Sequence, residues 1–244
     1  MTAPALFPVA LLAGGLATRL RPITETIPKA LVEIAGRPFI AWQLDLLARE
    51  GVTDVIVCAG YLGQRIEEEV GAGAAHGLRV RYSFDGDRLL GTGGALRRAL
   101  PLLDGPVFVL YGDSYLPISM TAVQGAYERS RQDALMTVFR NEGQWDRSNV
   151  EYDGSRIVRY DKRVQTPAMH HIDYGLGIVS RAVIADLPAD TVIDLADTYT
   201  ALAASGRLAG FEAHERFYEV GSFEGLEDMR RLVGGGAAGA KERQ

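Results

Sequence analysis

The sequence is poor in residues that build disulfide frameworks and metal clusters. Its 244 residues include one cysteine, Cys58, and four histidines. A single cysteine cannot form an intramolecular disulfide, and Cys58 stands in the apolar run 55–58, where a thiol is most often a buried core group. No histidine lies in a suggestive position near it, so we expect no cysteine nucleophile.

The sequence also lacks long basic blocks and long apolar runs. The net charge is -5 and no block is rich in Lys and Arg, which argues against a nucleic-acid backbone as the main partner. This charge balance is still compatible with a small anionic ligand bound in a local basic site. No apolar run approaches the roughly 20 residues that a membrane span needs, and the N-terminus lacks the regions of a secretory signal. We expect a cytoplasmic protein without a membrane partner.

The sequence lacks internal repeats, including the hexapeptide repeats of a β-helix. Two familiar phosphate-binding motifs, G-x-G-x-x-G and the Walker loop, are absent as well. What stands instead is a glycine pair, Gly14-Gly15, directly after an apolar run at residues 6–12. Glycines let backbone N–H groups approach a ligand closely, so this loop suits phosphates.

Positive charge gathers after this glycine pair, against the acidic balance of the whole chain. Residues 14–29 contain three cations, Arg19, Arg21 and Lys29, and one carboxylate, Glu25. This concentration predicts a site for a polyanion.

Apolar runs alternate with amphipathic stretches in the first half of the chain. We expect strands at 6–12, 54–59, 78–84 and 107–111, and helices at 38–50, 63–70 and 95–103. This alternation is typical of an α/β protein with a mostly parallel central sheet flanked by helices. The chain can bury one sizeable core, so we expect one domain at residues 1–233 and a disordered tail at 234–244.

The pattern loosens after residue 113. The expected elements there are helices at 120–132, 194–205 and 223–232, strands at 134–140, 208–213 and 217–220, and a hairpin at 149–160 that turns at Asp153-Gly154. Ligands of open α/β sheets bind beyond the carboxyl ends of the strands. The loops Gly14-Gly15 and Gly112-Asp113 should therefore face one another.

The first loop carries the pattern Gly-Gly-x-x-x-Arg-Leu-x-Pro at 14–22, then Pro28-Lys29 and Gly36-Arg37-Pro38. These residues resemble the signature of the sugar-1-phosphate nucleotidylyltransferases, and residues 91–95, Gly-Thr-Gly-Gly-Ala, resemble a glycine-rich loop of the same family. The resemblance covers about residues 6–232. It implies the Rossmann-like nucleotide-diphospho-sugar transferase fold and a Mg²⁺-dependent reaction. A nucleoside triphosphate and a sugar 1-phosphate would give a nucleotide sugar and pyrophosphate.

The resemblance also implies roles for individual residues. Arg19 and Lys29 would be catalytic, and a guanidinium suits this role because it can fork onto two phosphate oxygens. The nucleotide would bind Leu12, Ala13, Gly14, Gly15, Gly91, Thr92 and Asp113. The sugar phosphate would bind Gly93, Lys162 and Asp173. Two carboxylates, Asp113 and Glu219, would hold Mg²⁺.

Two of these positions depart from the family pattern. Glu219 stands where relatives have Asp before Val-Gly-Thr, and Asp173-Tyr174-Gly175 replaces Asn-Ala-Gly. These departures keep open a catalytically silent regulatory subunit that binds sugar nucleotides. A cytidylyltransferase for a non-sugar phosphate such as phosphocholine is a second alternative, which would require an aromatic cage.

Several properties stay open at this point. Side chains do not reveal which base is bound, nor whether the sugar is of the heptose, mannose, glucose or muramate type. Short relatives feed cell-surface polysaccharide synthesis, which we take as the expected role. The oligomeric state is not readable, and a homo-oligomer is possible. The adjacent His170 and His171 would point to opposite faces of an extended segment, so joint metal ligation is not expected.

Overall fold

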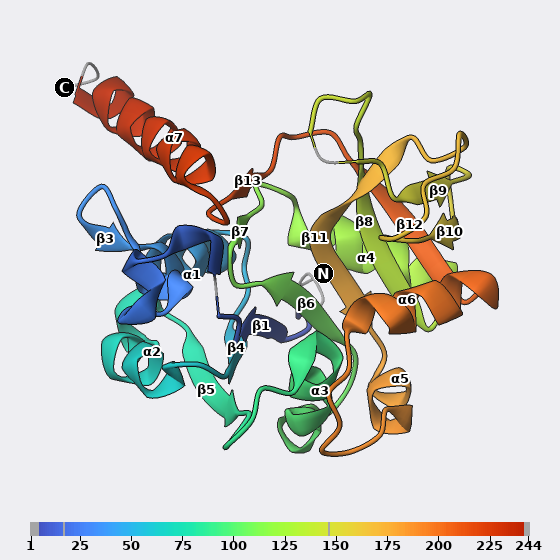
Figure 1. The fold of residues 1–244 in the computed structure, drawn as a ribbon, viewed down its shortest axis with the longest axis horizontal. Coiled ribbons are helices and arrows are strands. Elements are labelled where there is room, and N and C mark those ends of the chain that lie inside the picture. The colour runs from blue at the N-terminus through green and yellow to red at the C-terminus, as the bar shows by residue number, and fades with distance from the viewer. Residues whose placement is uncertain (1–4, 17, 146, 242–244) are drawn as a thin grey trace.

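A nine-stranded sheet forms the centre of the part of the chain that the computed structural model describes, residues 5–16, 18–145 and 147–241 (Figure 1). Its strands are β1 (Val9–Ala13), β4 (Asp54–Ala59), β5 (Arg79–Phe84), β6 (Val107–Tyr111), β8 (Ala134–Arg140), β9 (Val150–Tyr152), β10 (Ile157–Tyr160), β11 (His171–Val179) and β12 (Leu208–Ala213). The order is β10-β9-β11-β6-β1-β4-β5, and β8 pairs with both β11 and β12.

The half of the sheet that contains β1 is parallel. β1 lies between β4 and β6, and β5 follows β4, all in the same direction. β11 runs antiparallel to both β6 and β8, whereas β12 is parallel to β8. The expected α/β fold with a mostly parallel central sheet is confirmed.

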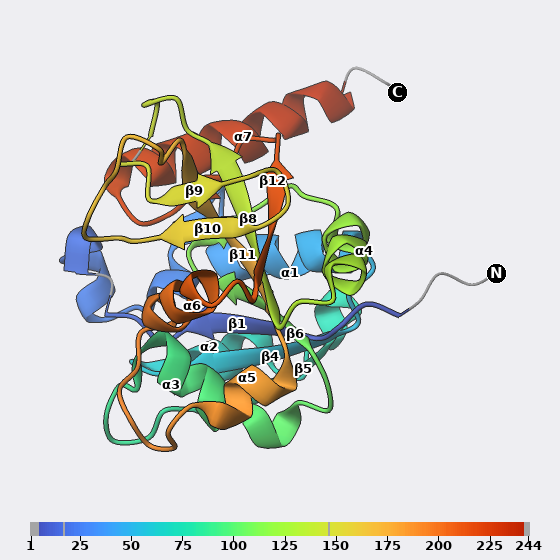
Figure 2. The same ribbon diagram turned by 90° about the vertical axis from the view of Figure 1, so that its right-hand side faces the viewer.

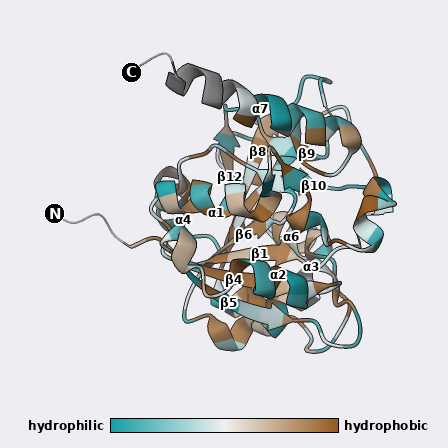
Figure 3. Cartoon of the chain, turned by 90° about the vertical axis from the view of Figure 1, so that its left-hand side faces the viewer, coloured by the Kyte–Doolittle hydropathy of each residue, from teal (hydrophilic) through white to brown (hydrophobic). Residues whose placement is uncertain are grey.

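Helices cover both faces of the sheet, as Figures 1 and 2 show. On one face lie α1 (Phe39–Arg49), α2 (Gly63–Val70) and α4 (Met120–Ser130), whose apolar residues share one buried cluster with the sheet. On the other lie α3 (Gly91–Arg98), α5 (Arg181–Asp186) and α6 (Leu195–Ala204), which share a second cluster. Figure 3 shows the hydrophobic strands enclosed between these layers. Each fully buried Leu, Ile or Val contributes about 1.5–3 kcal/mol.

A third buried cluster fixes the C-terminal helix α7 (Phe223–Lys241) to the body of the protein. It joins α7 to α1, to the small hairpin of β2 (Glu33–Ile34) and β3 (Arg37–Pro38), and to the strand pair β7 (Ser114–Tyr115) and β13 (Tyr218–Glu219). The N-terminal and C-terminal parts of the chain therefore meet in one cluster.

Most expected elements form close to their predicted positions, and two boundaries were wrong. The first strand begins at Val9 and not at residue 6, because the Phe7 N–H donates to the side chain of Gln124 and Pro8 has no N–H. The helix predicted at 95–103 begins at Gly91, and it ends at Arg98 because Pro101 cannot donate the next helical hydrogen bond.

Two further differences concern the second half of the chain. The sequence reasoning did not recognise β11 as a strand, although it is nine residues long and lies between β6 and β8. Helix α7 continues to Lys241, into the range 234–244 where a disordered tail is predicted. Residues 242–244 lie outside the described residues. No described helix combines the length and the hydropathy of a bilayer-spanning segment.

Candidate active site

A pocket of about 240 Å³ opens at the carboxyl ends of β1, β4, β5 and β6. Its wall comes from the loops that follow these strands and from the first turn of α3. The lining residues are Leu12, Ala13, Gly14, Gly15, Lys29, Ala30, Cys58, Asp85, Leu89, Gly91, Thr92, Ala95, Tyr111, Gly112 and Asp113. All seven residues predicted to bind the nucleotide thus lie around one cavity.

The two loops expected to face one another do so. The Gly112 N–H donates to the Leu12 carbonyl oxygen at 3.0 Å, which joins the ends of β6 and β1. A Cβ atom on Gly112 would lie 2.7 Å from that oxygen, and one on Gly14 would lie 3.2 Å from the Gly60 nitrogen. Backbone passes too close for a side chain at Gly112, and a Cβ at Gly14 would make a tight contact.

Lys29 and Asp113 both line this pocket and form an ion pair, with 2.6 Å between Lys29 Nζ and Asp113 Oδ2. Pro28, in extended conformation, precedes a single 3₁₀ turn, Lys29–Leu31, which directs Lys29 toward the end of β6. Both side chains are largely buried, at 18% and 23% exposure. A phosphate could therefore replace Asp113 as the partner of Lys29, and a divalent ion could replace Lys29 as the partner of Asp113.

Arg19 and Glu219 form a second, more open pair. Arg19 Nη2 lies 3.5 Å from Glu219 Oε1, and the side chains are 69% and 39% exposed. Both line a neighbouring hollow of about 340 Å³ beside the N-terminus of α7, and neither lines the first pocket. An exposed pair of this kind contributes only about 0–1 kcal/mol, so Arg19 can exchange Glu219 for a phosphate at little cost.

Glu219 is nevertheless held beside Asp113 by backbone contacts. The Val220 N–H donates to the Asp113 carbonyl oxygen at 2.8 Å, and β13 pairs with β7 directly after Asp113. The two predicted metal ligands thus come from adjacent segments, although their side chains line different hollows. Across the described part of the chain, no three or more His, Cys, Asp or Glu side chains gather as a metal-binding group. Mg²⁺ often takes one or two carboxylates and completes its shell with water and phosphate oxygens, so this donor set fits it.

The glycine-rich stretch at 91–95 is not a loop but the first turn of α3. The Gly93 N–H donates to the Ile193 carbonyl oxygen at 2.8 Å, and Gly93 does not line the pocket. The Thr92 hydroxyl donates to Asp194 at 3.1 Å and accepts from the Leu195 N–H at 2.8 Å, so it joins α3 to the start of α6. Thr92 still lines the pocket, but its hydroxyl already serves this connection.

Asp85, Cys58 and Tyr111 are among the pocket residues that were not predicted as site residues. Asp85 is 5% exposed; its Oδ2 accepts from the Leu90 N–H, and its buried Oδ1 has no hydrogen-bond partner within the described residues. Burial raises the pKa of Asp85. Burial also raises the pKa of the Cys58 thiol to about 12, so the thiol stays neutral and unreactive at pH 7. The available signal in the sequence was that Asp85 directly follows the predicted strand at 78–84.

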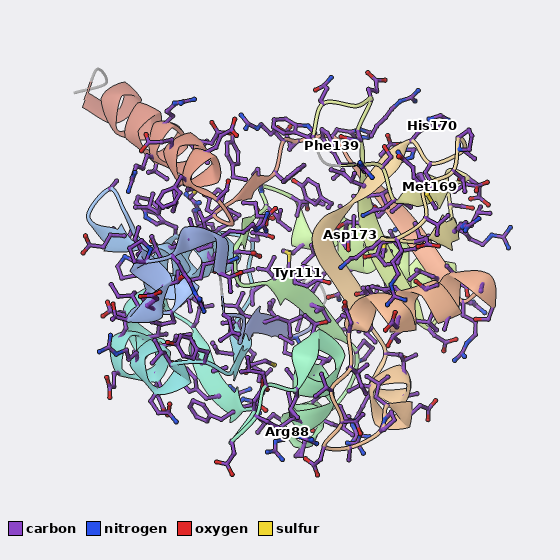
Figure 4. The ribbon with its side chains drawn as sticks, viewed as in Figure 1. Arg88, Tyr111, Phe139, Met169, His170 and Asp173 are labelled. Carbon is purple, nitrogen blue, oxygen red and sulfur yellow. The ribbon has the colours of Figure 1, made fainter. Side chains whose placement is uncertain are left out.

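Lys162 and Asp173 lie beyond the pocket wall, on the side of β11. The Asp173 carboxylate accepts from the Tyr160 hydroxyl at 3.3 Å and from the Gly175 N–H at 3.0 Å. Burial raises the pKa of Asp173, and the charge of Lys162 partly opposes this shift. Figure 4 shows Asp173 on β11 near Tyr111 at the end of β6.

The two adjacent histidines face different surroundings. His170 is exposed, whereas His171 is buried with Nε2 at 3.5 Å from Glu212 Oε1. Burial lowers the pKa of His171. The two imidazole rings therefore lie in different surroundings.

Comparison with known proteins identifies the kind of site. Residues 9–148 match the family model described as nucleotidyl transferase. The chain belongs to this family. N-acetylmuramate alpha-1-phosphate uridylyltransferase of Caulobacter vibrioides is 33% identical over 86% of this chain and 90% of its own length. The enzyme of that name from Neisseria meningitidis is 29% identical over 92% and 97%.

The fold of this nucleotidyltransferase is shared by solved structures. HddC from Yersinia pseudotuberculosis, complexed with GMP-PN, superimposes with a TM-score of 0.79 over 93% of this chain and 100% of that chain, at 23% identity. At this identity the likeness shows the fold alone. The family and its curated members identify this chain as an enzyme of the EC 2.7.7 class, within the sugar-1-phosphate nucleotidyltransferases.

Proposed function

We propose that this nucleotidyltransferase joins a nucleoside triphosphate to a sugar 1-phosphate, giving a nucleotide sugar and pyrophosphate. The observation that carries the proposal is the Lys29–Asp113 pair, set between two glycine-rich turns in a pocket at the strand ends. The named activities of the muramate relatives support it. As in the short relatives that the sequence resembles, the product would serve cell-surface polysaccharide synthesis.

In this reaction a phosphate oxygen of the sugar forms a bond to the α-phosphorus of the triphosphate. The bond from that phosphorus to the bridging oxygen breaks, and pyrophosphate leaves. The attacking oxygen is already ionised at neutral pH, so the chain needs no general base. Lys29 and Arg19 would neutralise charge on the phosphates, Lys29 from the pocket and Arg19 from the neighbouring hollow.

We propose Mg²⁺ as the cofactor, held by Asp113 with Glu219 from the neighbouring segment. When bound, it would supply positive charge to the phosphate oxygens and hold them in position. Lys162 and Asp173 would contact the sugar phosphate from the side of β11, and Gly93 would act by holding α3 against residues 191–193.

The nucleobase has two candidates. The muramate relatives are named uridylyltransferases, whereas the structural neighbour HddC was solved with GMP-PN. UTP and GTP are therefore the first triphosphates to test.

The decisive experiment is a pyrophosphate-release screen of UTP, GTP, CTP, dTTP and ATP against a panel of sugar 1-phosphates, with Mg²⁺ and with a chelator. We expect turnover with one or two pairs and loss of turnover on chelation. Asp113→Asn serves as the inactive control. If the protein binds a nucleotide but turns over none of the pairs, the proposal is contradicted and the silent regulatory subunit is favoured.

A further inference from the structure

Two loops from distant parts of the sequence meet beside the pocket. The wall loop, residues 85–90, follows β5 and carries Asp85, which lines the pocket. It lies against the outer segment, residues 187–194, which joins α5 to α6, and the Ile193 N–H donates to the Leu90 carbonyl oxygen at 2.9 Å. The outer segment is described throughout and contributes no residue to the pocket wall. It can therefore affect a bound substrate only through the residues that it touches.

Arg98, in the last turn of α3, joins the two loops through one guanidinium group. Its Nη2 donates to the Asp85 carbonyl oxygen at 3.0 Å, and its Nε donates to the Phe84 carbonyl oxygen at 3.4 Å. Its Nη1 donates to Asp190 Oδ1 at 2.9 Å. β5 stands at the end of the strand order, so the chain that leaves it has a neighbouring strand on one side only. Arg98 supplies hydrogen bonds to this chain where it turns away from the sheet.

The backbone of Asp190 indicates that the outer segment is held in a defined position. Asp190 has a φ of +50°, a left-handed conformation that residues other than glycine adopt uncommonly. Its carboxylate accepts from Arg98, and its carbonyl oxygen accepts from Arg88 Nη2 of the wall loop. Two arginines thus bind one residue in an unfavourable conformation, which persists only where its surroundings fix it.

The wall loop has little freedom to move without changing the pocket. A Cβ on Gly60 would lie 2.7 Å from Leu89 Cδ2 and 3.1 Å from Asp85 Oδ2, and one on Gly14 would lie 3.6 Å from the same oxygen. The wall loop therefore packs on the turns that follow β1 and β4. Asp85 Oδ2 accepts from the Leu90 N–H, whereas the buried Oδ1 has no partner within the described residues. A ligand donor can satisfy this oxygen only if the carboxylate stays in place.

We propose that Arg98 and Asp190 are positioning residues for the nucleoside triphosphate, which hold the wall loop where it contacts the bound nucleotide. This inference rests on the proposed function. Neither side chain lines the pocket, so both act through the wall loop. The wall loop shares the pocket with the residues predicted to bind the nucleotide, whereas Lys162 and Asp173 lie beyond the pocket wall. The pair should therefore affect binding of the triphosphate and not of the sugar 1-phosphate.

Steady-state kinetics with the substrates selected by the screen test this inference. Arg98→Ala removes all three hydrogen bonds, so we expect KM for the triphosphate to rise about tenfold, with kcat and KM for the sugar 1-phosphate within about twofold of wild type. Arg98→Lys should give an intermediate KM, because an ammonium group lacks the planar fork that binds several acceptors at once. Titration calorimetry of the triphosphate with Mg²⁺ and no acceptor measures the same change in affinity without turnover.

Asp190→Asn tests the other partner of the pair. Asparagine keeps the side-chain shape and also tolerates the left-handed conformation, so the variant removes the charge alone. The Arg98 and Asp190 side chains are 42% and 69% exposed, and an exposed ion pair is weak. Because Arg98 keeps its bonds to the two carbonyl oxygens, KM for the triphosphate should rise only about threefold.

Arg97→Ala is the matched control. Arg97 precedes Arg98 in the last turn of α3, and its Nε donates to the Leu187 carbonyl oxygen at 2.8 Å. It binds the outer segment, and no hydrogen bond joins it to the wall loop within the described residues. Both alanine variants should lower the Tm, because both lose contacts between α3 and the outer segment. Only Arg98→Ala should raise KM for the triphosphate.

The outcomes separate this inference from the proposed function. An equal rise in KM for Arg97→Ala and Arg98→Ala would overturn the inference, because general loosening of the outer segment would explain it. An unchanged affinity for the triphosphate in Arg98→Ala, or an equal loss for both substrates, would also overturn it. If the wild-type chain binds a triphosphate but releases no pyrophosphate with any pair, the proposed function fails and calorimetry decides the inference. If Arg98→Ala does not fold, Arg98→Lys and Asp190→Asn decide it.

Discussion

At the scale of single residues, the candidate site contains two pairs of opposite charges. Lys29 pairs with Asp113 in the pocket, and Arg19 pairs with Glu219 in the neighbouring hollow. All four residues were predicted as site residues from the sequence, because their charge and their spacing can be seen in a sequence motif. It could not predict how they pair, because pairing depends on β13 lying next to the end of β6.

Removing one of these charges should affect chemistry far more than folding. We expect Arg19→Ala and Asp113→Ala each to lower turnover about 10²-fold or more, because both groups would act on charge that develops in the transition state. Pyrophosphate release measures turnover, and circular dichroism checks the fold. Arg79→Ala, in a surface pair with Asp54 away from the pocket, is the control. Normal rates in both site variants would contradict the assigned roles.

Asp85 should make stability depend on pH. Its pKa in the folded chain is raised above the usual 3.8, so the folded protein loses stability as pH rises from that value through the folded pKa. Asp85→Asn removes this loss and keeps an oxygen for the Leu90 N–H. Its Tm should therefore rise relative to wild type between pH 3.5 and pH 8, by about 2–4 °C for each 1 kcal/mol. If the Tm of the two proteins changes with pH in parallel, the pKa of Asp85 is not raised by folding.

At the scale of elements, the glycine-rich turn of α3 shows where sequence reasoning reached its limit. Residues 91–95 resembled a ligand-binding loop, yet they begin a helix whose glycines allow residues 191–193 to pack against it. A Cβ on Gly94 would lie 2.4 Å from the Thr191 carbonyl oxygen. A glycine required by a ligand and a glycine required by neighbouring backbone look identical in one sequence.

Gly94→Ala tests this packing role. The added methyl group would press on backbone, so we expect a loss of about 1–3 kcal/mol in the free energy of unfolding. Urea denaturation measures it. Gly105→Ala is the matched control, because a Cβ there would meet no atom within 4 Å beyond its chain neighbours, and it should change stability by about 0.5 kcal/mol or less. Equal effects of the two substitutions would show that the close approach at Gly94 carries no cost.

At the scale of the whole molecule, the third cluster joins the beginning and end of the chain around the site. Met229 and Leu226 of α7 are fully buried with Ile34, Phe39 and Tyr115. The same cluster includes Val220, which follows Glu219. The local apolar periodicity predicted helix α7, but its contacts with residues almost 200 positions earlier have no local signal.

Met229→Ala should destabilise the whole protein by about 2–5 kcal/mol, because it leaves a cavity in this cluster. Phe223→Ala is the control on the same helix; its side chain is 54% exposed, so the loss should be much smaller. Urea unfolding followed by tryptophan fluorescence measures both. A Met229→Ala loss no larger than that of Phe223→Ala would show that α7 is not part of the cooperative core.

The position of β11 limits how the chain can be divided. The family model ends at residue 148, but β11, at residues 171–179, occupies the slot between β6 and β8. A fragment that stops at residue 148 would leave the edges of both strands without their partner and would lack Asp173 and Glu219. During synthesis on the ribosome, the candidate site can therefore be completed only after residue 219 has emerged.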